Sequence, residues 1–227
     1  LSMRTQWSEN GQIKKVTSPV SLLITGFAAI DDVRTTLTPQ LNAEEDDTTL
    51  VLIDLARGKM RMGGSIIGQV LNQSGNETPD LDDAKDLIAM VDAVNALRAK
   101  GQILAYHDKG DGGLLATVAE MAFAGHVGVA LNVDMLITEG DGISDSRMDS
   151  GEGKNWGKQV SGRREDLTLR ALFNEELGAV LQIKTADRSE VMQTLREHGL
   201  TTCSHIGGKT RPVPSAMGRG KGDMQAW

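Results

Sequence analysis

Runs of apolar residues, separated by polar and glycine-containing segments, predict a chain in which strands and helices alternate. Short runs rich in Val, Ile and Leu predict buried strands, and apolar residues three or four positions apart predict helices with one apolar face. The expected strands are 18–30 (with a bend or bulge at Gly26), 48–55, 103–106, 127–133, 178–184 and 201–206, and the expected helices are 65–71, 81–100, 114–122, 167–177 and 187–198. Because these elements do not follow a clean parallel repeat, we expect an α+β fold, a mixed β-sheet with helices packed on it.

One predicted strand ends in a compact cluster of charge and glycine. The apolar residues Ile103–Tyr106 run directly into His107-Asp-Lys-Gly-Asp-Gly-Gly113, and helical spacing begins at Leu114. The cluster therefore lies between the carboxyl end of a strand and the start of a helix. This is the place where α/β proteins bind small ligands.

The residue types in this cluster suit a phosphate held with a divalent cation. Asp108 and Asp111 offer hard oxygen ligands of the kind that magnesium prefers, and magnesium usually takes its remaining ligands from water and substrate phosphates. Gly110, Gly112 and Gly113 allow the backbone to fold tightly and to approach a ligand closely. The alternative is a polar turn in which Asp111 caps the following helix. Spacing alone slightly favours this alternative.

Two further groups of charged residues are candidate ligands. Arg57, Lys59 and Arg61 lie among glycines and are candidate phosphate contacts, with an exposed basic loop as the more frequent alternative. Glu175 and Glu176, near the end of the expected helix 167–177, are candidates for a metal. Acids at a helix end more often form caps or ion pairs, or face water.

Composition narrows the class of protein. The chain has 227 residues, of which 39% are hydrophobic and 24% charged, and its net charge is −7. A negative net charge argues against binding to nucleic acid or to a membrane surface by bulk electrostatics. No apolar run is long enough to span a membrane. The single Cys203 cannot form an internal disulfide, which fits a reducing cytoplasm.

Several blocks of the chain, taken together and in order, resemble one enzyme family. The family is phosphoribosylformylglycinamidine synthase of the large bacterial type, and the matching part is the C-terminal domain of its second aminoimidazole-ribonucleotide-synthetase-like half. The resemblance rests on Thr17–Ile24, Thr38–Leu41, His107–Leu114, Ala119–His126 and Leu172–Ala179.

The resemblance implies an activity and a set of site residues. The family enzyme uses ATP and glutamine to convert formylglycinamide ribonucleotide to the amidine in purine biosynthesis, and Mg²⁺ and ATP or ADP are the implied cofactors. Asp108 matches a magnesium ligand of the family. Gly110 stands where the family carries a nucleotide-contacting serine, so the hydroxyl of that contact is absent. The implied nucleotide contacts are His107, Gly110, Asp111 and Gly112.

The family enzyme is much longer than this chain, so the resemblance implies a fragment. We expect residues 1–17 to be the tail of a preceding domain, 18–207 the synthetase-like domain and 208–227 a truncated linker, with an insertion at about 138–166. The implied partners are the remaining synthetase and glutaminase domains. No catalytic residue is expected here, and the isolated chain is expected to be inactive. The alternatives are another ATP-dependent member of the superfamily, or a non-catalytic module that binds a partner domain.

Overall fold

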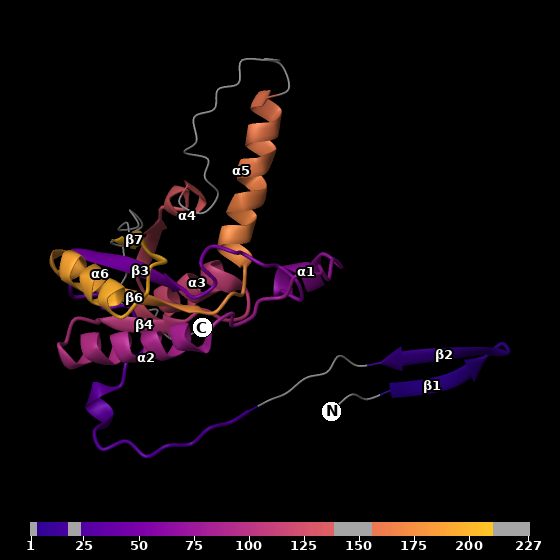
Figure 1. Ribbon diagram of the computed structural model, residues 1–227, viewed down its shortest axis with the longest axis horizontal. Helices are drawn as coiled ribbons and strands as arrows, with labels where there is room; N and C mark the ends of the chain where they lie inside the picture. Colours follow the sequence, from indigo (N-terminus) through magenta and orange to yellow (C-terminus); the bar gives the residue numbers. More distant parts are fainter. Residues whose placement is uncertain (1–3, 18–23, 139–155, 211–227) are drawn as a thin grey trace, which may run out of the picture. The chain divides into compact units, whose positions relative to one another are not determined.

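The computed structural model describes residues 4–17, 24–138 and 156–210 (Figure 1). The chain divides into two compact units, Leu1–Thr36 and Leu37–Trp227. The first contains a β-hairpin, and the second contains the sheet, its helices and every residue of the predicted site. Among the described helices, none combines the length and the apolar composition that crossing a bilayer requires.

The first unit begins with a hairpin that the sequence interpretation missed. Strands β1 (Arg4–Glu9) and β2 (Gln12–Thr17) pair antiparallel. Asn10 and Gly11 join them, with φ angles of 53° and 76°. Two successive positive φ angles in an Asn-Gly pair are typical of the two-residue turn that matches strand twist. The Asn-Gly pair was therefore a usable signal in a segment that we interpreted only as a polar tail.

The expectation of a strand over residues 18–30 is wrong for residues 24–30, the part that the structure describes. Residues 24–30 have no regular structure, and a short 3₁₀ helix, η1 (Val33–Thr35), follows. Ile24 and Phe27 are 82% and 94% exposed. An apolar, β-branched composition favours a strand only where a neighbouring strand completes its hydrogen bonds, and these residues pair with no described strand. Residues 18–23 lie outside the described part.

The second unit is built on a five-stranded sheet. The strand order is β4-β6-β3-β7-β5, and all four neighbouring pairs are antiparallel. The strands are β3 (Thr48–Asp54), β4 (Ala105–Asp108), β5 (Gly128–Leu131), β6 (Gly178–Lys184) and β7 (Cys203–Thr210). Together with the helices packed on both faces, this confirms the α+β fold class, although the sheet is antiparallel throughout and not mixed as expected.

The helices follow the sequence expectations except in one region. They are α1 (Ile66–Val70), α2 (Ala84–Ala99), α3 (Gly113–Gly125), α4 (Asp134–Thr138), α5 (Trp156–Phe173) and α6 (Arg188–Glu197), with a 3₁₀ turn η2 (Thr185–Asp187) before α6. Helix α5 begins 11 residues before the expected start at 167 and ends before the expected 177. The excursion expected at 138–166 therefore includes the first part of a helix. Its residues 139–155 lie outside the described part.

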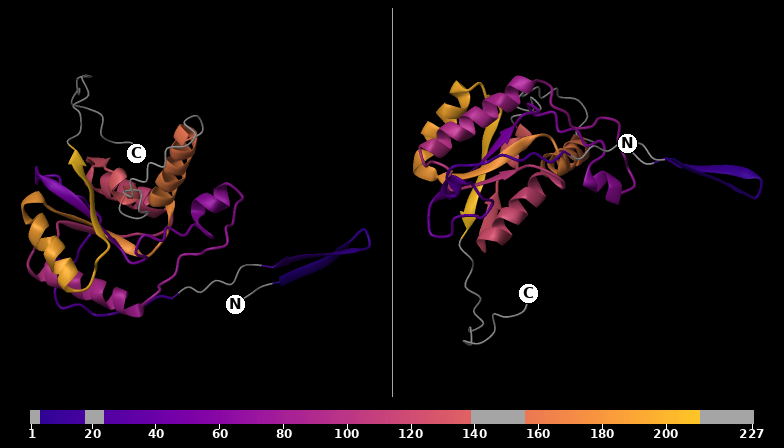
Figure 2. Two further views of the ribbon diagram at one scale, coloured as in Figure 1. Left: turned by 45° about the horizontal axis from the view of Figure 1, so that its top comes forward. Right: turned by 90° about the horizontal axis from the view of Figure 1, so that it is seen from below.

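The two faces of the sheet carry separate cores. On one face, Val51, Ile53 and Leu181 of the sheet pack against α2 and α6. On the other, Leu50 and Leu52 pack against α3, which in turn contacts α5 (Figure 2). Because successive residues of a strand point to opposite faces, the continuous apolar run of β3 fills both cores.

Candidate functional site

The predicted ligand-binding turn connects β4 to α3. Strand β4 ends at Asp108, helix α3 begins at Gly113, and the Gly113 N–H donates to the Gly110 carbonyl oxygen at 3.0 Å. Gly112 occupies the N-cap position with φ at 81°, and no side chain caps the helix locally. The interpretation of Asp111 as the helix cap is therefore wrong. The left-handed glycine takes the cap position, and Asp111 lies exposed one residue earlier.

Asp108 presents an exposed carboxylate at the end of β4. Its Oδ1 accepts a hydrogen bond of 2.5 Å from the hydroxyl of Tyr106, which lies two residues earlier on the same face of the strand. Burial of the ring, and next the hydrogen bond to the Asp108 carboxylate, raise the pKa of Tyr106. The phenol thus stays protonated and remains a donor to Asp108 across the physiological pH range.

His107 lies between these two residues, and its side chain points to the opposite face. There its Nε2 lies 2.8 Å from Oε2 of Glu120 on α3. The structure therefore does not bring His107 together with Asp108, although they are neighbours in the sequence. A contact between His107 and a nucleotide stays a prediction.

The acidic groups near the turn do not form a closed metal site. Within the described ranges, no three His, Cys, Asp or Glu side chains converge as metal ligands would. Asp108 is a single exposed carboxylate, and Gly110 has no atom within 4 Å of the position of an added Cβ. This donor set suits a magnesium ion that is shared with phosphate oxygens and water. It does not suit an ion enclosed by protein ligands.

Directly after Asp108, Lys109 points into the interior. Its Nζ donates to Oδ1 of Asn174 at 2.8 Å, and its backbone N–H donates to the Gly178 carbonyl oxygen at 2.9 Å. Burial lowers the pKa of Lys109, and the nearby carboxylates of Asp54 and Glu176 oppose that effect. Sequence reasoning missed this contact, because nothing local marks Asn174 as the partner.

Glu175 and Glu176, which we proposed as candidate metal ligands, follow the end of α5 and bind groups of the chain itself. Oε1 of Glu175 accepts hydrogen bonds from the backbone N–H groups of Gly112 at 2.9 Å and Ile66 at 2.8 Å. Glu176 is fully buried and forms an ion pair with Arg61, with 2.6 Å between Oε1 and Nε. The structure therefore gives both acids contacts that hold loops together.

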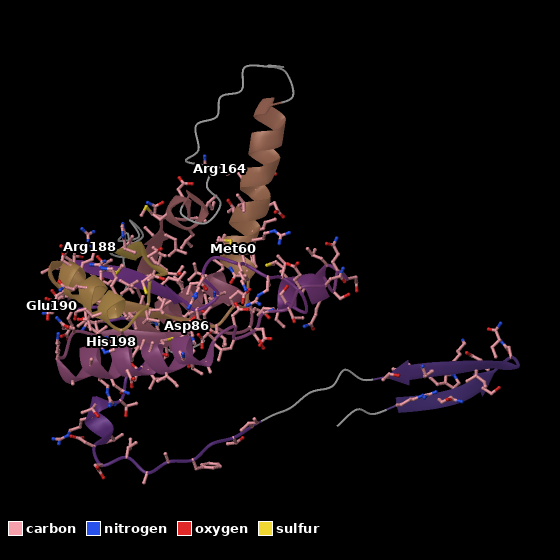
Figure 3. The ribbon with its side chains drawn as sticks, viewed as in Figure 1. Met60, Asp86, Arg164, Arg188, Glu190 and His198 are labelled. Carbon is pink, nitrogen blue, oxygen red and sulfur yellow. The ribbon has the colours of Figure 1, made fainter. Side chains whose placement is uncertain are left out.

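The basic residues of the loop after β3 are matched by acids. Arg57 pairs at 2.9 Å with Asp86 of α2, which Figure 3 labels. Lys59 pairs with Asp82 at 2.9 Å. The Arg61 guanidinium binds Glu176, and this hydrogen bond is the main cause that raises its pKa. None of the three is a free cation near the turn, so the interpretation of this loop as a phosphate site is not supported.

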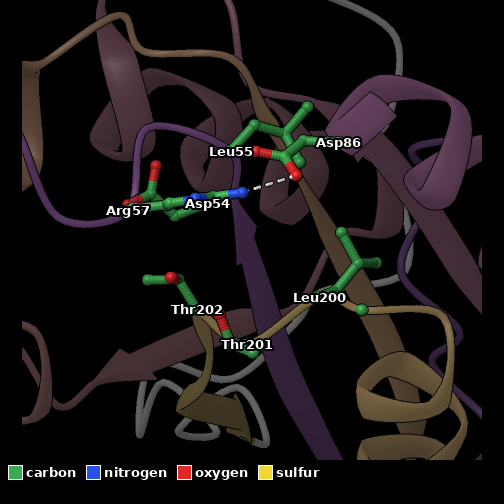
Figure 4. Close-up of a pocket in the computed structure, with 8 residues that line it drawn as sticks. Asp54, Leu55, Arg57, Asp86, Leu200, Thr201 and Thr202 are labelled. Atoms are coloured by element: carbon green, nitrogen blue, oxygen red, sulfur yellow. Dashed lines mark hydrogen bonds and ion pairs between the residues drawn. The ribbon is translucent and has the colours of Figure 1, made fainter. Parts of the chain in front are cut away.

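A small hollow lies near the end of β3, beside the first of these ion pairs. It is lined by Asp54, Leu55, Arg57, Asp86 and residues 199–202 (Figure 4). Its volume of about 10 Å³ holds about one water molecule. No residue of the predicted nucleotide site lines it, and it is too small for a nucleotide.

Comparison with known protein families identifies the family to which the second unit belongs. Residues 46–213 match the family described as AIR synthase related protein, C-terminal domain. The chain belongs to this family. The match spans all five strands of the sheet and the β4–α3 turn, so the site described above lies within the AIR synthase related domain.

Solved structures share the fold at low sequence identity. Thermotoga maritima PurL, in its complexes with ATP and with ADP, is 13% identical with a TM-score of 0.51, over 79% of this chain and 24% of that chain. E. coli HypE, a hydrogenase maturation protein, is 18% identical with a TM-score of 0.48, over 78% of this chain and 47% of that chain. At these identities the PurL likeness shows the fold alone, and the HypE score supports no argument. The chain spans about a quarter of the PurL structures.

Proposed function

We propose that this domain binds a nucleotide, through magnesium, at the β4–α3 turn. In this proposal it is part of the ATP-dependent synthase that makes formylglycinamidine ribonucleotide in purine biosynthesis. The observation that carries the proposal is the exposed Asp108 carboxylate beside the open backbone at Gly110. A charged nucleotide phosphate with its metal ion can approach this turn without displacing a side chain. The T. maritima PurL complexes with ATP and ADP support a nucleotide ligand for the family.

The proposal gives each site residue a role. Asp108 would hold the magnesium ion, which neutralises phosphate charge when bound, and the backbone at Gly110 and Asp111 would face the phosphates. The Gly112 N–H donates to Glu175, so Gly112 would help to hold the shape of the turn. His107 would act from the other face, where its contact with Glu120 fixes α3 against β4. The chain supplies no catalytic side chain in this scheme. The remaining synthetase and glutaminase domains are the proposed partners.

The motif blocks favour this synthase over other ATP-dependent members of the superfamily. Ala119–His126 and Leu172–Ala179 resemble the synthase, and the second of these blocks contacts the turn. The first covers the C-terminal half of α3 and its C-cap, and the second contains Asn174, Glu175 and Glu176, which contact Lys109, Gly112 and Arg61. The second block therefore helps to build the site.

Calorimetric titration of the 227-residue chain with ADP and magnesium tests the proposal. Asp108→Asn should weaken binding at least about tenfold, because a neutral amide loses its charge attraction to the cation. Asp92→Asn, which makes the same change at an exposed position on α2, is the matched control and should bind as the wild type does. With EDTA in place of magnesium, the three proteins should bind equally weakly.

Two results would count against the proposal. Equal ADP affinity for Asp108→Asn and the wild type would remove Asp108 from the metal site. A wild-type chain that takes up no nucleotide would favour the alternative, a module that only binds a partner domain.

A further inference from the structure

The segment that follows α5 reaches the turn of the proposed site and the loop before α1 with three consecutive side chains. Asn174 accepts from Lys109 of the turn at 2.8 Å, Glu175 accepts from the backbone of Gly112, and Glu176 binds Arg61 of the loop before α1. This arrangement connects parts of the chain that are 63 to 115 positions apart in the sequence.

Glu175 holds two backbone N–H groups that have no local acceptor. The N-cap of α3 is Gly112, which has no side chain to accept a hydrogen bond. At α1 the cap is Ser65, whose hydroxyl accepts from Gly68 and so leaves the Ile66 N–H to Glu175. A carboxylate that accepts from two N–H groups forms stronger bonds than a neutral acceptor does.

Close packing fixes the position of Glu175 relative to the turn. Gly113 has φ at 68°, and a Cβ there would lie 2.6 Å from the carbonyl oxygen of Asn174. The start of α3 thus lies directly against the backbone that carries Glu175. Asn174 and Glu176 are buried on either side of it.

We propose that Glu175 is a positioning residue that clamps the β4–α3 turn to the start of α1 and sets the shape of the turn that receives the nucleotide. The inference rests on the proposed function for its ligand, and its structural part stands on the contacts above. A turn that is already ordered does not need to lose conformational freedom when the ligand binds. The clamp therefore raises nucleotide affinity without touching the nucleotide.

Amide hydrogen exchange and ADP titration of the full chain test the clamp separately from the proposed function. Glu175→Ala removes the oxygen that accepts both hydrogen bonds, and Glu175→Gln keeps an acceptor oxygen but loses the charge. Glu165→Ala, at an exposed position on α5, is the matched control. We expect exchange at Gly112 and Ile66 to be about tenfold faster in Glu175→Ala than in the control, with a smaller increase in Glu175→Gln.

Nucleotide affinity should follow the same order, with ADP bound about tenfold more weakly by Glu175→Ala and partly rescued in Glu175→Gln. Unchanged exchange at both amides in Glu175→Ala would overturn the clamp. Tighter ADP binding by that variant would also overturn it, since Glu175 would then compete with the phosphate. If the wild type binds no ADP, the proposed function fails, and the exchange rates alone decide whether the clamp exists.

Discussion

The buried ion pair between Glu176 and Arg61 gives the sharpest prediction about stability. The Glu176 side chain is 1% exposed, and it accepts from the backbone N–H, Nε and Nη2 of Arg61 at 2.8, 2.6 and 2.8 Å. Glu176→Gln keeps the side-chain volume, but it places an NH₂ donor against the N–H donors of Arg61. Removing one partner of a buried pair costs about 3–5 kcal/mol, because the other charge stays buried.

Two remaining contacts of Arg61 place the expected cost at the lower end of this range. Its guanidinium still binds Oδ1 of Asp82 at 3.3 Å and the carbonyl oxygen of Asp80 at 2.7 Å. We therefore expect Glu176→Gln to lose about 3 kcal/mol of unfolding free energy. For a protein of this size, that loss lowers the melting temperature by about 6–12 °C.

Urea denaturation followed by circular dichroism measures this loss, and two variants serve as controls. Lys59 lies in the same loop as Arg61, and Lys59→Met breaks only an exposed ion pair with Asp82. The urea midpoint of this variant should therefore change little. The double variant Arg61→Met/Glu176→Met removes both buried charges. It should lose less unfolding free energy than the single variants Arg61→Met and Glu176→Met lose when their losses are added. A Glu176→Gln protein within about 1 kcal/mol of the wild type would refute the reasoning. So would a fully additive double variant.

Three further predictions concern the turn itself. Gly110→Ser should leave the melting temperature nearly unchanged, because Gly110 has open space around it and no positive φ angle; a clear loss in a thermal melt would contradict this. Gly113→Ala should destabilise the chain in the same melt, since φ is 68° and the new Cβ would meet a carbonyl oxygen at 2.6 Å. Lys109 has a lowered pKa, so the unfolded state binds more protons than the folded state between that pKa and the ordinary value of 10.5. The stability of the wild type relative to Lys109→Met should therefore rise with pH through this window in urea titrations, and a flat difference would contradict the burial of the ammonium.

The elements that the sequence predicted well are those whose signal is local and whose partners lie in the same unit. Strand β6 has the bounds expected from its apolar run, and α2 lies within the expected 81–100, with Gly101 just beyond its end at a φ of 70°. The expectation for 24–30 was wrong, because an apolar strand also needs a neighbour. The start of α5 was missed because its first residues are polar and glycine-containing, a composition that we interpreted as a surface excursion.

At the site, the sequence located the turn but not the contacts that shape it. The pattern of a strand followed by charge and glycine correctly placed Asp108 at the end of β4 and Gly110 in the turn before α3. The partners of Glu175 and Glu176 lie 63 to 115 positions away, and no pattern near either acid identifies them. Two acids at the end of a predicted helix resembled metal ligands or caps. Only the folded chain shows that one holds the turn and the other a buried arginine.

The three residues at the end of β4 explain what a ligand can meet at this turn. His107 points to α3, Lys109, which follows β4, points inward to Asn174, and Asp108 is the exposed residue of the three. Beyond Lys109, Gly110 offers backbone only, and the exposed Asp111 adds a second carboxylate. A ligand that binds here would therefore be recognised by the negative charge of its phosphates. A cation bound to a carboxylate and main-chain N–H groups would contact those phosphates, and no side chain of the turn would contact a base. Nucleotides that differ in their base should then bind this turn with similar affinity, and removing a phosphate should weaken binding far more than exchanging adenine for guanine.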